Sequence, residues 1–166
     1  MSKKASEALM EKKKQIDRAI PAYIKSKEFE LVAIKALEDF IKRVKRGIMP
    51  DMAKIPALGS EAYIELRKKY SGNLGRLAKA TKSNATATGQ MLDAMTYEMT
   101  QQGFILFVAD SQRNGELSGS DSKLSNKEVA AYYSKARNIF DFSKPELNRI
   151  IRTIKSDLTK IINLSK

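Results

Sequence analysis

Residues 91–110 read MLDAMTYEMTQQGFILFVAD, and the hydrophobic pattern changes its period within this segment. From Met95 to Thr100, apolar and polar side chains alternate, which is typical of a strand with one covered face. Gln101-Gln102-Gly103 fits a hairpin turn, and the apolar run 104–109 predicts a second strand. The segment therefore predicts an antiparallel hairpin, with extended backbone from Met91 onward.

The second predicted strand is apolar on both of its faces, because side chains in a strand point alternately to opposite sides. Helices on one side of a small sheet can cover only one of these faces. The other face is covered either by a neighbouring subunit, which indicates an oligomer, or by further helices of the same chain. The residues that we expect at an oligomer interface are Phe104, Leu106, Phe107, Glu116 and Leu117.

Helical patterns precede the hairpin. Residues 28–46 have the strongest one, with apolar side chains at i, i+3, i+4 and i+7 and Gly47 at the expected C-terminal stop. The cations Lys42, Arg43, Lys45 and Arg46 near that stop are interpreted as complementing the helix dipole, in preference to contacting nucleic acid. A shorter helix is predicted over residues 5–20, and Pro21 either ends it or opens the next turn.

Further helices are predicted on both sides of the hairpin. One runs from Ser60 to about Tyr70, and another runs from a cap at Asn126 to about Ala136. Ser143 and Glu146 form a capping box at the start of a last, amphipathic helix, which we expect to pack on the sheet. The order of helices, hairpin and helices predicts an α+β fold. We expect one domain over residues 1–166, with an N-terminal helical arm at 1–27 and a core at 28–166.

The composition excludes several kinds of chemistry. The chain has 166 residues with no cysteine and no histidine, so thiol nucleophiles, Ser-His-Asp triads and Cys/His metal sites are ruled out. There is also no phosphate-binding loop or dinucleotide fingerprint. We therefore expect no enzyme and no cofactor. No apolar run is long enough to span a membrane, and Met1-Ser2-Lys3-Lys4 is not followed by an apolar signal core, which predicts a cytosolic place of synthesis.

Positive charge is concentrated in the first half of the chain. The net charge is +12; residues 1–83 hold 20 basic and 10 acidic residues, whereas residues 84–166 hold 11 and 9. Residues 66–92 contain no acidic residue, which indicates either a surface for phosphate or an acidic protein, or merely a solvated lysine-rich face. The candidate partner-binding residues in this stretch are Arg67, Lys68, Lys69, Arg76, Lys79 and Lys82.

The segment Ser111–Asn126 has the composition of a loop, with glycines, serines and mixed charge. A loop of this length is functional, disordered alone, or ordered by a partner. Because its glycine and serine content does not offset the entropy of ordering, we expect it to become ordered against a neighbouring subunit.

Four short motifs occur in order along the chain. They are Tyr63-x-x-Leu66-Arg67-x-x-Tyr70, the run Thr88–Met95 that enters the hairpin, Val129-Ala130-Ala131-Tyr132-Tyr133, and Arg137–Ser143 ahead of the last helix. In this order they resemble the virion morphogenesis proteins of tailed bacteriophages, also called tail completion or neck proteins. The resemblance covers roughly residues 30–166. Its structural motif residues are Thr88, Gly89, Leu92, Arg137, Phe140 and Phe142, the two phenylalanines being expected to anchor the last helix on the sheet.

The resemblance implies a structural virion protein without catalytic activity. Such a protein forms a ring at the head–tail junction, with six-fold symmetry favoured over twelve-fold, and it joins or finishes the tail. Its implied partners are copies of itself, the neighbouring connector and tail-tube or terminator proteins, and packaged DNA. Its implied location is the virion, after assembly in the host cytoplasm. The alternative hypothesis is a free basic nucleic-acid-binding protein.

Overall fold

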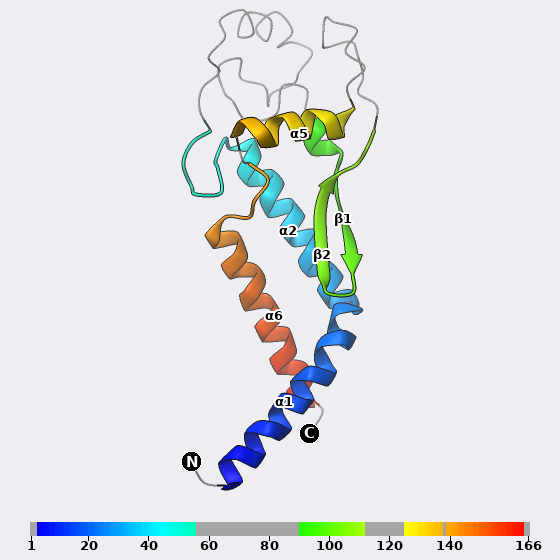
Figure 1. The fold of residues 1–166 in the computed structure, drawn as a ribbon, viewed down its shortest axis with the longest axis vertical. Helices are drawn as coiled ribbons and strands as arrows, with labels where there is room; N and C mark the ends of the chain where they lie inside the picture. Colours follow the sequence, from blue (N-terminus) through cyan, green and yellow to red (C-terminus); the bar gives the residue numbers. More distant parts are fainter. Residues whose placement is uncertain (1–2, 56–89, 112–124, 138, 165–166) are drawn as a thin grey trace, which may run out of the picture.

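The computed structural model describes residues 3–55, 90–111, 125–137 and 139–164. The elements are α1 (Lys3–Ile24), α2 (Lys27–Lys45), α4 (Gln90–Asp93), β1 (Met95–Thr100), β2 (Gly103–Val108), α5 (Asn126–Arg137) and α6 (Lys144–Leu164). The α+β class is confirmed. The described elements form an elongated body in which α2 is central, α6 lies along one side of it and the hairpin along another (Figure 1).

Helix α2 carries the core, as its hydrophobic pattern predicts. Ser26 caps its first turn by accepting a hydrogen bond from the Phe29 amide at 3.3 Å. Gly47, with φ of 72°, ends it in the left-handed conformation and donates to the carbonyl of Val44 at 2.8 Å. The side chains that form the main core are Phe40, Val44, Ile55, Met91, Leu92, Met95, Val108, Ala130 and Ile139.

The predicted hairpin forms, with Gln101-Gln102 as its turn and Gly103 as the first residue of β2. Met95 pairs with Val108 at the open end, and Thr100 pairs with Gly103 at the turn. The expectation of extended backbone from Met91 is wrong, because residues 90–93 form a helical turn, α4. Met91 and Leu92 are adjacent in sequence and both buried. A strand would point them to opposite faces, whereas a helical turn lets both reach the core.

The capping box of α6 is confirmed. The Ser143 amide and hydroxyl both donate to Oε2 of Glu146, at 2.6 and 2.7 Å, and the Glu146 amide donates back to the Ser143 hydroxyl at 3.4 Å. The helix was expected to pack on the sheet, but its extensive contacts are with α2 and α1. The sheet is reached instead by Phe142, just before the helix, whose ring lies edge-on to Phe104 with centroids 6.4 Å apart.

Helix α1 continues through Pro21 to Ile24, so the prediction that this proline ends the helix or opens a new turn is wrong. The reason is tertiary. Tyr23 is 2% exposed, packs edge-on against Phe29 and donates a hydrogen bond to Asp157 of α6 at 2.9 Å. This packing outweighs the local penalty of a proline inside a helix, which is about 3 kcal/mol.

The sequence predicts Asn126 as the cap of helix α5, but the structure shows that the cap is Ser125. The Ser125 amide donates to Glu128 Oε2 at 2.7 Å, and the Glu128 amide donates to the Ser125 hydroxyl at 3.3 Å. Asn126 is instead tied to Ser111: its amide donates to the Ser111 carbonyl and its side chain donates to the Ser111 hydroxyl. Residues 111 and 126, the two ends of the predicted loop, are therefore held together.

Candidate interaction surface

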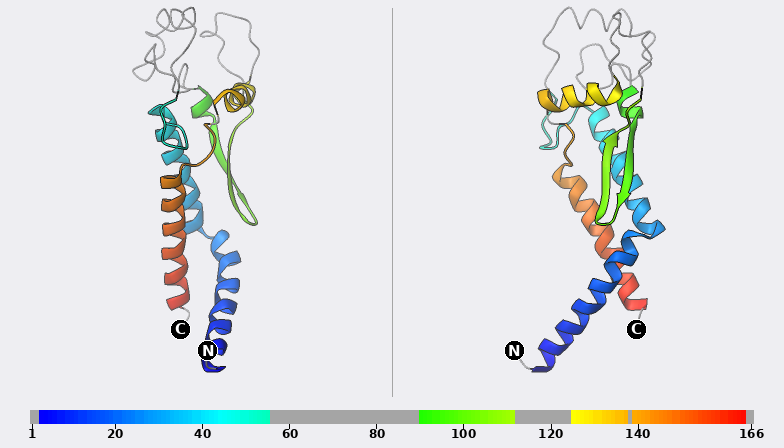
Figure 2. Two further views of the ribbon diagram at one scale, coloured as in Figure 1. Left: turned by 60° about the vertical axis from the view of Figure 1, so that its left-hand side comes forward. Right: turned by 45° about the vertical axis from the view of Figure 1, so that its right-hand side comes forward.

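The hairpin leaves one apolar face uncovered by the described residues. We define the hairpin surface as Thr96, Glu98, Ile105 and Phe107, which share this face because Thr96 pairs with Phe107 and Glu98 with Ile105. Ile105 is 54% exposed and Phe107 is 40% exposed. The opposite face of the hairpin points toward α2 (Figure 2). Of the two alternatives for the second face, coverage by further helices of the same chain is not seen among the described residues.

The five expected interface residues have different positions. Phe104 and Leu106 are half-buried and point inward: Phe104 contacts Phe29 with ring centroids 5.9 Å apart, and Leu106 packs against the core. Phe107 lies on the hairpin surface. Glu116 and Leu117 lie outside the described residues. Ile105 was missed, although the alternation of side chains in β2 places it on the same face as Phe107.

A groove of about 520 Å³ extends from the edge of the hairpin surface to α5. Phe107 and Ala131 contribute apolar walls, and Asp110 and Lys127 contribute one charge of each sign. The apolar area around Phe107 is therefore continuous with a shallow hollow of the surface.

Arg43 forms the most extensive polar cluster in the described part of the chain. Its Nε donates to both carboxylate oxygens of Glu146 at 3.0 Å, Nη1 donates to the carbonyl of Ile48, and Nη2 donates to the carbonyls of Ile139 and Asp141. The guanidinium also lies 5.0 Å from the centroid of the Phe40 ring. Arg43 thus ties the end of α2 to the connector after it and to the start of α6.

The assignment of Arg43 to the helix dipole alone is therefore wrong, since the side chain is only 7% exposed. The sequence spacing indicates this burial, because Arg43 lies three residues after Phe40 and seven residues after Ala36, on the buried side of α2. Lys42 and Arg46, which lie one turn apart outside the buried stripe, are exposed as expected of dipole-complementing cations.

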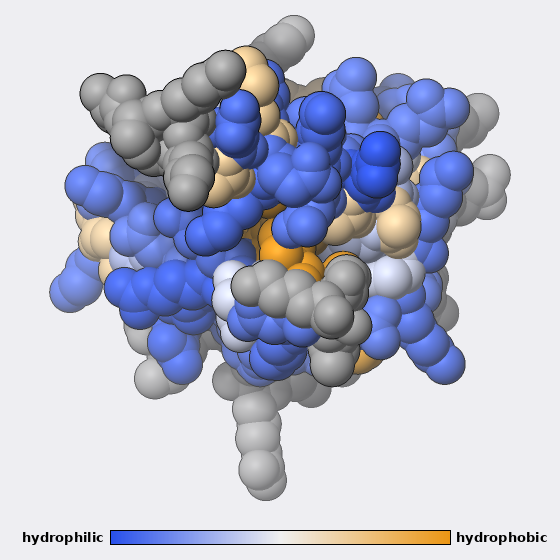
Figure 3. Space-filling view, turned by 90° about the horizontal axis from the view of Figure 1, so that it is seen from below, coloured by the Kyte–Doolittle hydropathy of each residue, from blue (hydrophilic) through white to orange (hydrophobic). Residues whose placement is uncertain are grey.

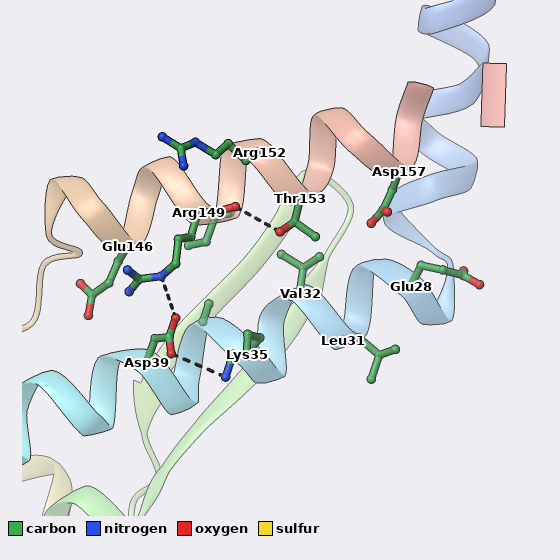
Figure 4. Close-up of a pocket in the computed structure, with 12 residues that line it drawn as sticks. Glu28, Leu31, Val32, Lys35, Asp39, Glu146, Arg149, Arg152, Thr153 and Asp157 are labelled. Carbon is green, nitrogen blue, oxygen red and sulfur yellow. Dashed lines mark hydrogen bonds and ion pairs between the residues drawn. The ribbon is translucent and has the colours of Figure 1, made fainter. Parts of the chain in front are cut away.

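A second groove, of about 530 Å³, lies between α2 and α6 (Figure 4). Asp39 of α2 is shared by Arg149 of α6 at 3.0 Å and by Lys35 at 3.7 Å. Val32 and Ile150 contribute apolar groups to its lining. Because the cations of these ion pairs are more than half exposed, the pairs contribute little to stability.

Two tyrosines donate hydrogen bonds to carboxylates. Burial raises the pKa of Tyr23 far above its ordinary value of 10.0, and the hydrogen bond to Asp157 raises it further. The hydrogen bond that Tyr97 donates to Glu30 at 2.9 Å raises the pKa of Tyr97. Both hydroxyls therefore stay protonated at neutral pH and join the hairpin and α1 to neighbouring helices.

The end of the molecule near α1 is mainly hydrophilic, with a small apolar area at its centre (Figure 3).

The remaining predicted site residues are distributed as follows. Leu92 is fully buried in the core, Phe140 and Phe142 both contact Phe40 of α2, and Arg137 ends α5. Thr88 and Gly89 lie outside the described residues, as do all the candidate partner-binding residues, which are Arg67, Lys68, Lys69, Arg76, Lys79 and Lys82.

Among the described residues, no group of three or more acidic side chains is placed to hold a metal ion. None of the described helices is both long enough and apolar enough to cross a membrane. No protein family, curated protein or solved structure matches the chain.

Proposed function

We propose that this chain is a structural protein that assembles with copies of itself through the hairpin surface. The observation that carries this proposal is the exposure of Ile105 and Phe107 on a face that no described residue covers. Fully burying an apolar side chain of this size stabilises an association by roughly 1.5–3 kcal/mol. A two-stranded hairpin also has an unpaired backbone edge on each strand, and such edges invite pairing with another chain.

A structural role also agrees with how three carboxylates, one of them buried and two partly buried, are used. Glu146 is engaged by Arg43 and by the cap of α6. Asp157 and Glu30 each accept a hydrogen bond from a tyrosine. These groups join one element to another. Glu146 and Asp157 also line the groove between α2 and α6, and their carboxylates are already bonded there to Arg43 and Tyr23. We therefore propose a role in assembly and not in catalysis.

The resemblance to tailed-phage neck proteins suggests the particle in which such assembly takes place. We place the chain in a ring at the head–tail junction, between the connector and the tail-tube or terminator proteins, where it joins or finishes the tail. The net charge of +12 suits either packaged DNA passing through the ring or acidic faces of the neighbouring proteins.

Analytical ultracentrifugation of the whole protein, together with purification of the particles, tests the proposal. We expect the wild-type protein to associate with rising concentration and to remain with particles through a density gradient. A protein that stays monomeric and separates from the particles would contradict it. If that protein instead binds duplex DNA with a steep dependence on salt, the alternative of a free nucleic-acid-binding protein is supported.

A further inference from the structure

Helix α6 carries a second uncovered apolar surface. Leu147 is 44% exposed and Ile151 is 47% exposed, and their spacing of four residues places them side by side on the helix. The packing of α6 against α2 uses a different side of the helix, on which Glu146 bonds to Arg43 and Arg149 bonds to Asp39. Leu147 and Ile151 are thus free to contact another molecule.

This α6 surface has a basic edge. Lys144 and Lys155 lie three residues before Leu147 and four residues after Ile151, so each is one helical turn from an exposed apolar side chain. Both lysines are exposed, and neither forms a side-chain ion pair with any residue that the structure describes. The acidic residues of α6, Glu146 and Asp157, are on another side and bond to Arg43 and Tyr23.

The hairpin surface has the complementary charge at the same spacing. Ile105 and Phe107 are two residues apart in a strand, a distance of about 7 Å. Leu147 and Ile151 are four residues apart in a helix, a distance of about 6 Å along its axis. Glu98 lies directly across from Ile105, is exposed, and has no ionic partner among the described residues.

We propose that the hairpin surface of one copy packs on the α6 surface of the next copy. Ile105 then lies over Ile151, Phe107 over Leu147, and Glu98 beside Lys155. Within one chain the two surfaces cannot meet, because α6 and the hairpin lie along different sides of α2 (Figure 2). A contact between two different surfaces is head-to-tail, and repetition of such a contact closes into a ring when the rotation allows. This inference rests on the self-association proposed above and specifies its geometry.

Because the chain contains no cysteine, single cysteines can test the contact directly. Ile105→Cys and Ile151→Cys proteins are oxidised separately and as a mixture, and disulfides are detected on a non-reducing gel. We expect a disulfide-linked dimer in the mixture and little or none in either protein alone, since a disulfide requires Cα atoms within about 7 Å. Met52→Cys, at a position that is 54% exposed, replaces either partner as the control and should not cross-link.

Charge reversal provides a second, independent measurement. Glu98→Lys alone and Lys155→Glu alone should each raise the dissociation constant of self-association by roughly 3- to 10-fold at low salt. The protein carrying both changes should recover most of the wild-type value, because the pair is restored across the interface. Lys54→Glu, at an exposed position in the connector after α2, is the matched control and should leave the constant unchanged.

Two results separate this inference from the proposed function. If the wild-type protein does not self-associate at all, both are overturned. If it self-associates but Ile105→Cys cross-links only to itself and Lys155→Glu has no effect, the interface joins two hairpins. The head-to-tail contact is then overturned, while assembly through the hairpin surface remains supported.

Discussion

At the scale of single residues, Arg43 has a larger structural role than a charged side chain near the end of a helix usually has. A guanidinium that donates five hydrogen bonds within a site that is 7% exposed has no equivalent in lysine, whose ammonium is a point charge with fewer donors. The carbonyls of Ile139 and Asp141, which accept two of these bonds, belong to the segment that leads into α6. Arg43 therefore positions α6 against α2.

We predict that Arg43→Lys lowers the free energy of unfolding by about 3–5 kcal/mol, because it leaves Glu146 and buried carbonyls incompletely bonded. Urea denaturation followed by circular dichroism measures this. Arg46→Lys, three residues later and exposed, is the control and should change stability by less than about 0.5 kcal/mol. Equal effects of the two substitutions would show that the cluster is not important for stability.

Tyr23 leads to a prediction about pH. Its pKa is raised in the folded state above 10.0, so the unfolded chain loses this proton first as the pH rises. The stabilising contribution of Tyr23 is therefore complete below pH about 10 and is progressively lost above it. We expect Tyr23→Phe to cost about 1 kcal/mol at neutral pH and to reduce the loss of stability above pH 10. Parallel curves for the two proteins in alkaline urea titrations would contradict this.

At the scale of elements, tertiary contacts set several helix boundaries at positions other than those that the local sequence predicts. The stripe of α2 and the capping box of α6 agree with their surroundings: α2 begins and ends within about two residues of the prediction, and α6 begins directly after its predicted cap. In contrast, α1 continues past Pro21, α4 replaces the start of an expected strand, and α5 is capped one residue earlier than expected. In the first two cases, side chains reach buried positions only because the local preference is overridden.

The continuation of α1 through Pro21 gives a prediction at this scale. Pro21→Ala should raise the free energy of unfolding by about 1–3 kcal/mol, because it restores a helical hydrogen bond and removes a clash. Thermal unfolding followed by circular dichroism tests this. Pro50→Ala, in the turn after α2, lies outside any helix and should not be stabilising. A lower stability of Pro21→Ala would mean that the proline itself is required for the packing of Tyr23.

At the scale of the whole molecule, apolar side chains are exposed on several elements of a strongly charged chain. Ile105 and Phe107 on the hairpin and Leu147 and Ile151 on α6 are the pairs that the proposals use. Single exposed apolar residues are ordinary, whereas contiguous exposed apolar patches mark interaction sites.

We predict that Phe107→Lys abolishes self-association while the protein stays folded, because Phe107 is 40% exposed and outside the core. Sedimentation velocity and circular dichroism measure the two properties on one sample. Met52→Lys, at a position 54% exposed in the connector after α2, should associate like the wild type. Loss of the folded spectrum in Phe107→Lys would instead assign this residue to the interior.

The last prediction concerns the basic stretch, which lies outside the described residues. If Arg67, Lys69 and Arg76 contact DNA phosphates, changing all three to Gln should reduce the salt dependence of binding by roughly three in the logarithmic slope. If they contact an acidic ring protein, the wild type binds free DNA weakly and the same changes prevent joining of heads and tails. We favour the protein partner, because the sequence from 67 to 82 contains only one aromatic residue, Tyr70, and no duplex-reading motif.

The sequence by itself determined the elements whose information is local: the period-two hairpin, the amphipathic helices α2 and α6, the stop of α2 at Gly47, the capping box of α6, and the α+β class. It also determined the charge distribution and the chemistry that a chain without cysteine or histidine cannot perform. Only the tertiary structure decided that Arg43 is buried, that Phe104 points inward while Ile105 stays exposed, and that α6 packs on α2 and α1. The physical reason is that period and capping depend on residues a few positions apart, whereas burial depends on partners such as Glu146, which is 103 residues from Arg43.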